Sequence, residues 1–470
     1  MCGINIFNKL NSSLEEINRY CKNRGPDHTN IESINNITFI HNLLSITGSK
    51  IIQPIKKDNV VLTFNGEIYN YQTLNNNHEY ENDNNEENKY KSDGEAILDL
   101  YLNNKYYDIE EYINKLDGEF AIVIVDFNLD KLFMITDPFA TKPLFYSLNG
   151  KDFMISSYSA CITNNNFTDF EKVDANTCIT INLIDNTIIN KIKLHKFDYK
   201  QFKINYNDWI TAFEKSIKKR INTNKKIFVS LSSGYDSGAI SCQINKEGKS
   251  YTSYSVYGKE DPHVINNRCS INQEKIKQIN QEATYLSKKF HLNEEIVQNY
   301  KKRNQIECCD FTSIIRKNEP TKKYGVLKDR ASCGGSFIYS IARNDNCIIN
   351  LSGQGADEIL SDYGFNGNGK TWHSCFGGKF TNDLQDLVEN KWESFQGGIN
   401  TCLLMKEEII SGSWGIESRY PFLDKVLVQE FLWLTPELKN KYYKAPLHYY
   451  LTINNYPFKI NSKIGFNCLY

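Results

Sequence analysis

The chain has 470 residues, enough for more than one domain. Its 55 basic and 56 acidic side chains give a formal net charge of −1 at pH 7, which provides no electrostatic footprint for nucleic acid or an anionic membrane. No apolar run approaches the roughly 20 residues that a membrane span needs, and polar residues interrupt the amino terminus, so we expect neither a span nor a signal peptide. The 13 cysteines show no regular spacing, and we interpret most of them as buried thiols in a reducing cytoplasm.

The amino terminus reads Met1-Cys2-Gly3-Ile4. Removal of Met1 would make Cys2 an N-terminal nucleophile. An α-amine has a pKa of about 7.7–8.0, so roughly one in seven is neutral at pH 7 and can accept the thiol proton. Cys2 would therefore carry its own base. Taken alone, a cysteine at this position is more often a chance small residue.

Alternating or continuous apolar runs predict buried strands in the first part of the chain, each ending in Asp or Asn-Gly turn chemistry. A segment that is almost wholly polar and charged predicts a solvated loop insertion. The strands are expected at residues 59–64, 120–126, 131–137 and within 178–194, the insertion at 75–91, and a linker at 200–206.

Five motifs follow Cys2: R-G-P-D at 24–27, F-N-G-E-I-Y-N at 64–70, S-D-G-E at 92–95, L-D-G-E-F-A at 116–121 and D-P-F-A-T-K-P-L at 137–144. In this order they resemble a class II glutamine amidotransferase domain over roughly the first 160 residues. The resemblance implies an α+β N-terminal-nucleophile fold, a four-layer sandwich of antiparallel sheets between helices.

The same resemblance implies roles for individual residues. Cys2 would attack the glutamine amide, while the side-chain amide of Asn65 and the backbone N–H of Gly66 would form the oxyanion hole. Glu67 and Asp93 would bind the α-amino group of glutamine, because an ammonium needs such acceptors.

One position departs from the family. Leu43 stands where the family has an arginine that grips the α-carboxylate of glutamine. A lost charge-assisted pair costs about 1.5–3 kcal/mol. Either another cation such as Arg24 or Lys50 compensates, or free ammonia is the better nitrogen donor.

The second part of the chain is organised around a strand, a loop of small polar residues and a helix. Apolar spacing predicts a helix over 208–221, a strand over 227–231 and a second helical pattern from 238. The loop between them exposes backbone N–H groups that suit a pyrophosphate. It resembles the S-G-G-x-D-S loop of the PP-loop ATP pyrophosphatases, with Ser233 in place of the first Gly. The implied ATP-binding residues here are Leu231, Ser232, Ser233, Gly234, Asp236 and Ser237.

Further elements fit this resemblance. A strand at 251–256 would line the adenine pocket through Val256, a helix is predicted over 281–291, and Glu319-Pro320 falls where the family has a turn.

A third apolar strand at 348–351 runs into S-G-Q-G-A-D-E at 352–358. This resembles the S-G-E-G-A-D-E motif of asparagine synthetases, with Ser352 and Gly353 at ATP and with Gln354, Asp357 and Glu358 at the acceptor. Asp357 would complete a magnesium site with Asp236. Gln354 replaces a Glu that guides the attacking amine, and an amide cannot act as a base.

Two later motifs extend the resemblance. The stretch 415–424 resembles the G-I-E-A-R-x-P-F-L-D signature, in which Arg419 would hold an acceptor carboxylate. The alternative for this stretch is helix capping and core packing. K-I-G-F at 463–466 places Lys463 where the family has a lysine that neutralises charge as AMP is transferred.

Together the motifs resemble the glutamine-hydrolysing asparagine synthetases, with a glutaminase domain at 1–200 and an α/β parallel-sheet ATP pyrophosphatase domain at 201–470. The implied reaction is ATP- and Mg²⁺-dependent amidation of aspartate, through β-aspartyl-AMP, with ammonia from glutamine. The partners are then small molecules, without nucleic acid or membrane, and a homodimer is one option for the assembly. Two rivals stay open: another carboxylate acceptor, and a catalytically weakened regulatory protein.

Overall fold

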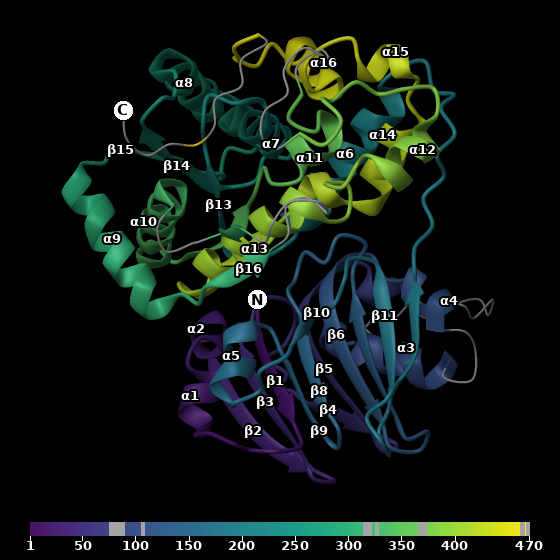
Figure 1. Ribbon diagram of the computed structural model, residues 1–470. Helices are drawn as coiled ribbons and strands as arrows, with labels where there is room; N and C mark the ends of the chain where they lie inside the picture. The colour runs from purple at the N-terminus through teal and green to yellow at the C-terminus, as the bar shows by residue number, and fades with distance from the viewer. Residues whose placement is uncertain are drawn as a thin grey trace, which may run out of the picture. The chain divides into compact units, whose positions relative to one another are not determined.

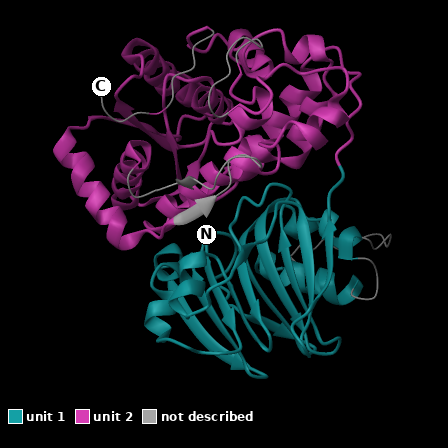
Figure 2. Ribbon diagram, viewed as in Figure 1, with its two compact units in different colours: residues 1–196 teal, residues 197–470 magenta. Residues whose placement is uncertain are grey.

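The computed structural model describes residues 1–74, 90–104, 109–313, 322–324, 329–364, 374–460 and 466. The chain divides into two compact units, Met1–Lys196 and Phe197–Tyr470 (Figure 2). The boundary expected from the sequence lies four residues further along the chain. Among the described helices, none is both long and apolar enough to cross a membrane.

Unit 1 contains two six-stranded sheets in which every neighbouring pair of strands is antiparallel (Figure 1). The first sheet has the order β10-β8-β9-β1-β3-β2, and the second β12-β11-β7-β6-β5-β4. The strands of the first sheet are β1 (Gly3–Phe7), β2 (His28–Ile34), β3 (Ile37–Leu43), β8 (Phe145–Asn149), β9 (Asp152–Ser156) and β10 (Glu171–Lys172). Those of the second are β4 (Ile55–Lys57), β5 (Val60–Ile68), β6 (Gly118–Asp126), β7 (Lys131–Thr136), β11 (Thr177–Asn182) and β12 (Ile188–Lys193).

Strand β6 shows why a continuous apolar run forms here. Side chains alternate between the two faces of a strand. Ala121, Val123 and Val125 belong to a core shared with the first sheet, whereas Phe120, Ile122 and Ile124 belong to a second core. That second core also contains residues of α3 (Asp93–Asn104) and α4 (Ile109–Asn114). Both faces of the second sheet are therefore covered. Helices α2 (Cys21–Arg24) and α5 (Ser159–Asn164) contact strands of the first sheet, and α1 (Leu14–Asn18) packs against α5.

Unit 2 is built on a five-stranded parallel sheet with the order β15-β14-β13-β18-β19. The chain runs from β13 outward to β14 and β15, then returns to β18 on the other side of β13. Ligands of such sheets bind where the strand order reverses, at the carboxyl ends of the two strands. The strands are β13 (Lys226–Ser230), β14 (Tyr251–Tyr257), β15 (Tyr285–His291), β18 (Cys347–Leu351) and β19 (Glu417–Arg419), and a separate pair joins β16 (Phe311–Ser313) to β17 (Lys322–Tyr324).

Helices cover this sheet in two groups, which Figure 1 shows on opposite sides of the strands. Helix α7 packs with α6, α8 and α16, and α10 packs with α9 and α13. The helices are α6 (Asn207–Arg220), α7 (Tyr235–Lys246), α8 (Pro262–Ile279), α9 (Glu294–Glu307), α10 (Arg330–Asn344), α11 (Ala356–Leu360), α12 (Leu384–Asn390), α13 (Gly398–Gly412), α14 (Lys425–Trp433), α15 (Pro436–Lys439) and α16 (Ala445–Ile453).

Most element predictions are confirmed to within four residues at each end, but one is wrong. Residues 281–291 were expected to form a helix, and the structure has the strand β15 there. All seven of its residues pair in parallel with β14, so backbone hydrogen bonds to a distant strand outweigh the local preference. The expected insertion at 75–91, the Glu319-Pro320 turn and Lys463 lie wholly or mostly outside the described residues.

Candidate active sites, one in each unit

The first candidate site is a cavity of about 40 Å³ in unit 1, with room for a few water molecules. Cys2 lines it, one residue before β1 begins. Gly66 and Glu67 reach it from β5, and Asp93 reaches it from the start of α3. The structure therefore brings together most of the glutaminase residues that the motifs predict, although they lie up to 91 positions apart in the sequence.

Asn65 contacts the proposed nucleophile directly. The Cys2 backbone N–H donates to Asn65 Oδ1 at 2.7 Å, and the Asn65 side chain is fully buried. Its Nδ2 group has no hydrogen-bond partner among the described residues. A buried, unmatched N–H donor costs about 1–3 kcal/mol unless a ligand accepts from it. This geometry suits an oxyanion-hole donor beside Cys2.

Gly66 can only be a glycine here. Its φ is +144°, and an added Cβ would lie 1.9 Å from the Glu119 carbonyl oxygen. The adjacent carboxylates are held in place: Thr47 Oγ1 donates to Glu67 Oε2 at 2.5 Å, and the Ile68 N–H donates to Asp93 Oδ2 at 3.2 Å. Two carboxylates on one cavity wall offer acceptors for an ammonium group.

No lysine or arginine is among the described residues that line this cavity, whereas Leu43 is one of them. Arg24 is buried and donates to the Cys2 carbonyl at 2.8 Å and to Tyr158 Oη at 2.6 Å, so it holds the backbone of Cys2. Lys50 is exposed, with its Nζ 3.3 Å from the Asp27 carbonyl oxygen. Neither cation is among the described residues that line the cavity.

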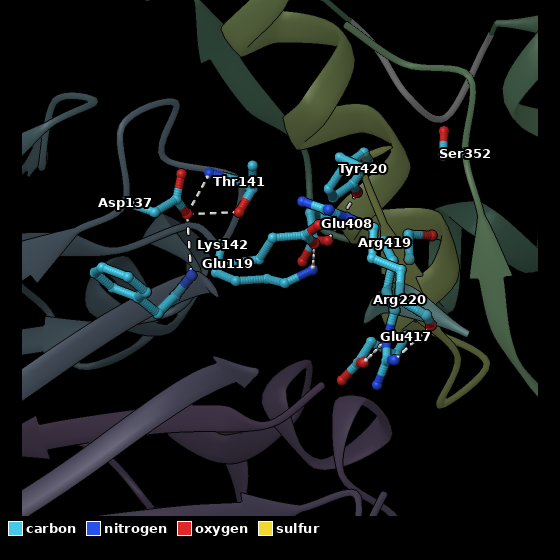
Figure 3. Close-up of polar contacts among 12 residues, drawn as sticks. Glu119, Asp137, Thr141, Lys142, Arg220, Ser352, Glu408, Glu417, Arg419 and Tyr420 are labelled. Carbon is cyan, nitrogen blue, oxygen red and sulfur yellow. Dashed lines mark hydrogen bonds and ion pairs between the residues drawn. The ribbon is translucent and has the colours of Figure 1, made fainter. Parts of the chain in front are cut away.

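Residues of the D-P-F-A-T-K motif contact strand β6, which pairs with β5 (Figure 3). Asp137 accepts from the Phe120 N–H at 3.0 Å and from Thr141 Oγ1 at 2.5 Å, and burial raises the pKa of Asp137 to about 6. Lys142 Nζ lies 3.5 Å from Glu119 Oε2, with both side chains almost fully buried. Because Phe120 and Glu119 pair with Gly66 and Glu67 across β5 and β6, these contacts position the strand that carries the predicted oxyanion hole.

The second candidate site is a cavity of about 280 Å³ in unit 2, at the carboxyl ends of β13 and β18. The structure gathers eight of the predicted ATP and acceptor residues around it: Leu231, Ser232, Asp236, Ser237, Val256, Ser352, Gly353 and Gln354. The two loops approach closely, since a Cβ on Gly353 would lie 2.9 Å from Asp236 Cβ. Phe466, of the K-I-G-F motif, also lines the cavity.

The loop after β13 is already hydrogen-bonded. The Ser233 N–H donates to Glu260 Oε2 at 2.7 Å, and the Ser233 hydroxyl donates to the same oxygen. The buried guanidinium of Arg268 donates to the carbonyls of Ser232 and Gly234 at 2.5 and 2.9 Å. A phosphate that uses the Ser233 N–H must therefore displace the Glu260 carboxylate. No motif indicated Glu260 or Arg268; the one signal in the sequence is the serine at position 233, which has a hydroxyl that a glycine lacks.

Asp236 and Asp357 converge as predicted, but a lysine lies between them. Lys444 Nζ is 2.6 and 2.7 Å from the two oxygens of Asp236 and 2.9 Å from Asp357 Oδ1, and only 2 % of the Lys444 side chain is exposed. Tyr443 Oη also donates to Asp357, at 2.7 Å. The two aspartates raise the pKa of Lys444 against the opposing effect of burial, which is the largest contribution.

The two aspartates are the predicted ligands of a magnesium ion, and their surroundings decide whether they form such a site. Mg²⁺ takes near-octahedral oxygen ligands at about 2.0–2.1 Å. Here an ammonium engages both oxygens of Asp236 and one of Asp357. Among the described residues, no group of three or more His, Cys, Asp or Glu side chains is arranged to hold a metal. The side chains fit the lysine cation and do not form an open Mg²⁺ site.

The acceptor residues fall into two sets. Gln354 lines the cavity, and its Nε2 donates to Glu358 Oε1 at 2.9 Å. Glu358 and Asp357 do not line it; Glu358 is buried and also accepts from the Gly355 N–H at 3.1 Å. Two charged residues that no motif indicated, Lys406 and Glu407, do line it.

Arg419 is not among the residues that line the cavity, although its carbonyl accepts from the Ser352 N–H at 2.9 Å. It is buried, its Nε lies 2.8 Å from Glu417 Oε1, and its Nη1 donates to the Arg220 carbonyl at 2.7 Å (Figure 3). Nearby, Arg220 pairs with Asp424 at 2.9 Å, and Tyr420 donates to Glu408. This geometry favours the core-packing alternative for the 415–424 stretch.

The comparisons with known proteins agree with the motifs. A family model described as a glutamine amidotransferase domain matches residues 1–203. The asparagine synthetases [glutamine-hydrolyzing] of Rattus norvegicus and Homo sapiens are each 24% identical to this chain over 455 residues, covering 88% of the chain and 73% of the relative. A putative asparagine synthetase [glutamine-hydrolyzing] of Methanocaldococcus jannaschii is 27% identical over 436 residues, covering 87% and 71%.

Among solved structures, the chain is similar to the glutamine phosphoribosylpyrophosphate amidotransferase of B. subtilis, with 14% identity over 48% of this chain and 60% of that one. The TM-score of 0.32 is too low to establish a shared fold. The resemblance that the motifs indicated is confirmed: the chain is similar over most of its length to glutamine-hydrolysing asparagine synthetases, and its first 203 residues match a glutamine amidotransferase domain.

Proposed function

We propose that this chain is a carbon–nitrogen ligase that converts aspartate to asparagine, using ATP and ammonia derived from glutamine, and releases AMP and pyrophosphate. One observation carries the proposal beyond the resemblance. The cavity of unit 2 gathers the loop after β13 and the loop after β18, which are the two loops that the motifs assign to ATP and to the acceptor. It lies at the point where the strand order of the parallel sheet reverses.

In unit 1, the Cys2 thiol attacks the glutamine amide once Met1 is removed, and the neutral α-amine accepts the thiol proton. The Cys2 nitrogen already lies 2.7 Å from Asn65 Oδ1, and the buried Asn65 Nδ2 supplies a donor for the tetrahedral oxyanion. Such a donor contributes about 3–4 kcal/mol. Glu67 and Asp93 receive the α-ammonium of glutamine.

In unit 2, the backbone of the 231–234 loop and the first turn of α7 hold the ATP phosphates, and Val256 lines the adenine pocket. The aspartate side chain attacks the α-phosphorus to form β-aspartyl-AMP, and ammonia then displaces AMP. Lys463, outside the described residues, would stabilise the charge that develops as pyrophosphate leaves. Mg²⁺ enters the proposal as a partner of the ATP phosphates, because Lys444 already engages the predicted ligands Asp236 and Asp357.

Two observations favour a second candidate for the nitrogen donor. The unit 1 cavity is small, and no cation lies among its described lining residues. Both features favour free ammonia over glutamine. The acceptor likewise has a rival: Arg419 is buried against Glu417, so its guanidinium supplies no partner for the carboxylate that distinguishes aspartate from other acids.

The test is pyrophosphate release by the full chain with ATP and Mg²⁺, across a panel of carboxylic acids, each with glutamine or ammonia as donor. Aspartate is expected to give the largest release, with asparagine as the product. If another acid stimulates release and aspartate does not, the acceptor assignment is wrong. If no acid stimulates release with either donor, the chain is not a ligase of this kind.

We also propose that residues 1–200 form the glutaminase domain, as a four-layer sandwich, and that residues 201–470 form the synthetase domain. The same proposal includes a cytoplasmic location and a homodimeric assembly.

A further inference from the structure

Glu407 is a carboxylate in the wall of the unit 2 cavity that the motifs leave without a role. It lies on α13 and is half-buried. Its Oε1 accepts from Asn350 Nδ2 at 2.9 Å and from Tyr339 Oη at 3.0 Å, and its Oε2 accepts from Ser352 Oγ at 2.7 Å. All three of these partners are neutral donors, and all three also line the cavity.

The proposed reaction needs a base at this place. An attacking amine must lose a proton as the amide forms, and Gln354 stands where relatives of the motif have a carboxylate. The Gln354 side chain is an amide, and its Nε2 donates to Glu358. The carboxylate of Glu358 also accepts from Tyr363 and from the Gly355 N–H, and Glu358 does not line the cavity. The side chain at position 354 therefore cannot serve as the base.

Three carboxylates lie among the described residues that line the cavity: Asp236, Glu260 and Glu407. The Lys444 ammonium engages Asp236, which makes that group a poor proton acceptor. Glu260 accepts from the backbone and hydroxyl of Ser233 in the phosphate loop. Glu407 faces neutral donors instead, and burial, with a smaller contribution from Glu408, raises the pKa of Glu407 above its usual range. A raised pKa makes a carboxylate a stronger base.

Glu407 is also close to the acceptor loop. Ser352 Oγ donates to Glu407 and accepts from the Gln354 N–H at 3.1 Å, so one hydroxyl links the Glu407 carboxylate to the backbone of residue 354. We propose that Glu407 is the general base that takes a proton from the attacking amine, in the role that Gln354 cannot fill; this inference rests on the proposed function.

The step balances as follows in atoms and charge. The lone pair of ammonia forms a C–N bond to the acyl carbon of the acyl-adenylate, and the carbonyl electrons move to oxygen. One N–H proton passes to Glu407, which becomes neutral. The carbonyl re-forms as the C–O bond to the AMP phosphate breaks and AMP leaves with that electron pair. Glu407 later releases its proton to water.

The experiment separates acyl activation from amide formation. Activation is followed by acceptor-dependent exchange of labelled pyrophosphate into ATP, and amide formation is followed with ammonia as donor. For Glu407→Gln we expect exchange within about twofold of wild type and amide formation slower by about 10²- to 10⁴-fold. With hydroxylamine, a less basic nucleophile that needs less help in losing its proton, the defect should shrink at least tenfold.

The matched control is Glu408→Gln. Glu408 is the next residue on α13, but it accepts from Tyr420 and does not line the cavity. Both rates should stay within about threefold of wild type.

The titratable and charged groups around Glu407 come from three places. Glu408 and Lys406 lie on α13, Tyr339 lies on α10, and Asp329, which pairs with Lys406, caps α10. Asp236 and Glu260 line the same cavity.

Loss of exchange together with amide formation in Glu407→Gln would overturn the inference, because Glu407 would then bind ATP or the acceptor. Unchanged amide formation would overturn it as well. If Glu407→Gln does not fold, Glu407→Asp serves instead: it keeps the carboxylate but withdraws it, and we expect normal exchange with amide formation at least tenfold slower. If wild-type protein shows no exchange with any acid, the proposed function itself is rejected. If an acid other than aspartate supports exchange, the variants are compared with that acid.

Discussion

The two cavities differ in how their predicted residues are assembled. In unit 1, three of the five predicted glutaminase residues, Asn65 to Glu67, are neighbours on the single strand β5, and the adjacent strand β6 pairs with each of them. In unit 2, loops from distant parts of the chain meet at the edge of a parallel sheet, and internal partners already engage several predicted residues. Lys444 engages the two aspartates, and Glu260 engages Ser233. A motif on one strand predicts how its residues lie, because the strand fixes the positions of neighbours. A site assembled from several loops also depends on charged side chains that distant segments bring to it.

The largest expected effect comes from a substitution that disables the unit 1 cavity and leaves the unit 2 cavity active. Cys2→Ala removes the thiol nucleophile, so glutamine-dependent amide formation should fall by at least about 10³-fold, while ammonia-dependent formation stays within twofold. Cys375→Ala is the control, because Cys375 is the least buried of the described cysteines. Measuring both donors side by side checks this, and equal loss of both activities would reject two separate sites.

The next prediction concerns the cation of unit 2. Lys444→Met leaves two carboxylates facing each other without the buried ammonium, which should lower the free energy of unfolding by about 3–5 kcal/mol. Lys391→Met breaks an exposed pair with Asp386 that solvent screens, so it should lower the free energy of unfolding far less than Lys444→Met does.

Urea unfolding measures both variants. Added Mg²⁺ without nucleotide should stabilise Lys444→Met and leave wild type unchanged, since the carboxylates become available only when the lysine is gone. Equal stabilisation of both proteins would show that Lys444 does not compete with the metal.

Unit 1 should show a pH dependence that comes from Asp137. Burial raises the pKa of Asp137 from 3.8 to about 6, so the folded protein binds this proton more tightly than the unfolded chain does. The stability that this group contributes is therefore full below about pH 4 and falls as pH rises to about 6, by about 3 kcal/mol in all. The Asp137→Asn variant has no carboxyl group here, so its free energy of unfolding should not show this fall between pH 4 and pH 7. Urea unfolding across that range tests it, and identical pH profiles for the two proteins would contradict it.

The smallest expected effect concerns Leu43 in unit 1, where the family has an arginine. Leu43 lines the unit 1 cavity, where an arginine would offer a partner for the α-carboxylate of glutamine. Leu43→Arg should lower KM for glutamine by about tenfold and leave kcat and ammonia use unchanged, which corresponds to about 1.4 kcal/mol. Leu43→Met, a substitution of similar volume, should leave KM unchanged. Steady-state kinetics decide between these outcomes, and an unaltered KM in Leu43→Arg would mean that glutamine binds elsewhere.

Local sequence patterns predicted much of this protein. Strand β6 alternates between two cores, and its continuous apolar run already indicated a strand buried on both faces. The resemblance of the motifs to a known family placed Cys2, Gly66, Glu67 and Asp93 in one site, and the structure gathers these four residues around one cavity. The nucleotide and acceptor loops were predicted from their motifs and from the apolar strand that each loop follows, since adjacent parallel strands end at one edge of the sheet.

Only the tertiary structure decided the rest. Residues 285–291 form a strand because β14 supplies a ladder for their backbone, and no local pattern encodes that neighbour. Lys444 lies 208 positions after Asp236, and Glu407 lies 55 positions after Ser352, so no motif spacing links these pairs. Charged side chains find their partners through the folding of distant segments, since an ion pair depends on distance in space and not on separation in the chain. The sequence alone thus determined which chemistry each unit suits, and the packing of unit 2 determined which carboxylates are held by other groups and which one faces neutral donors in the cavity.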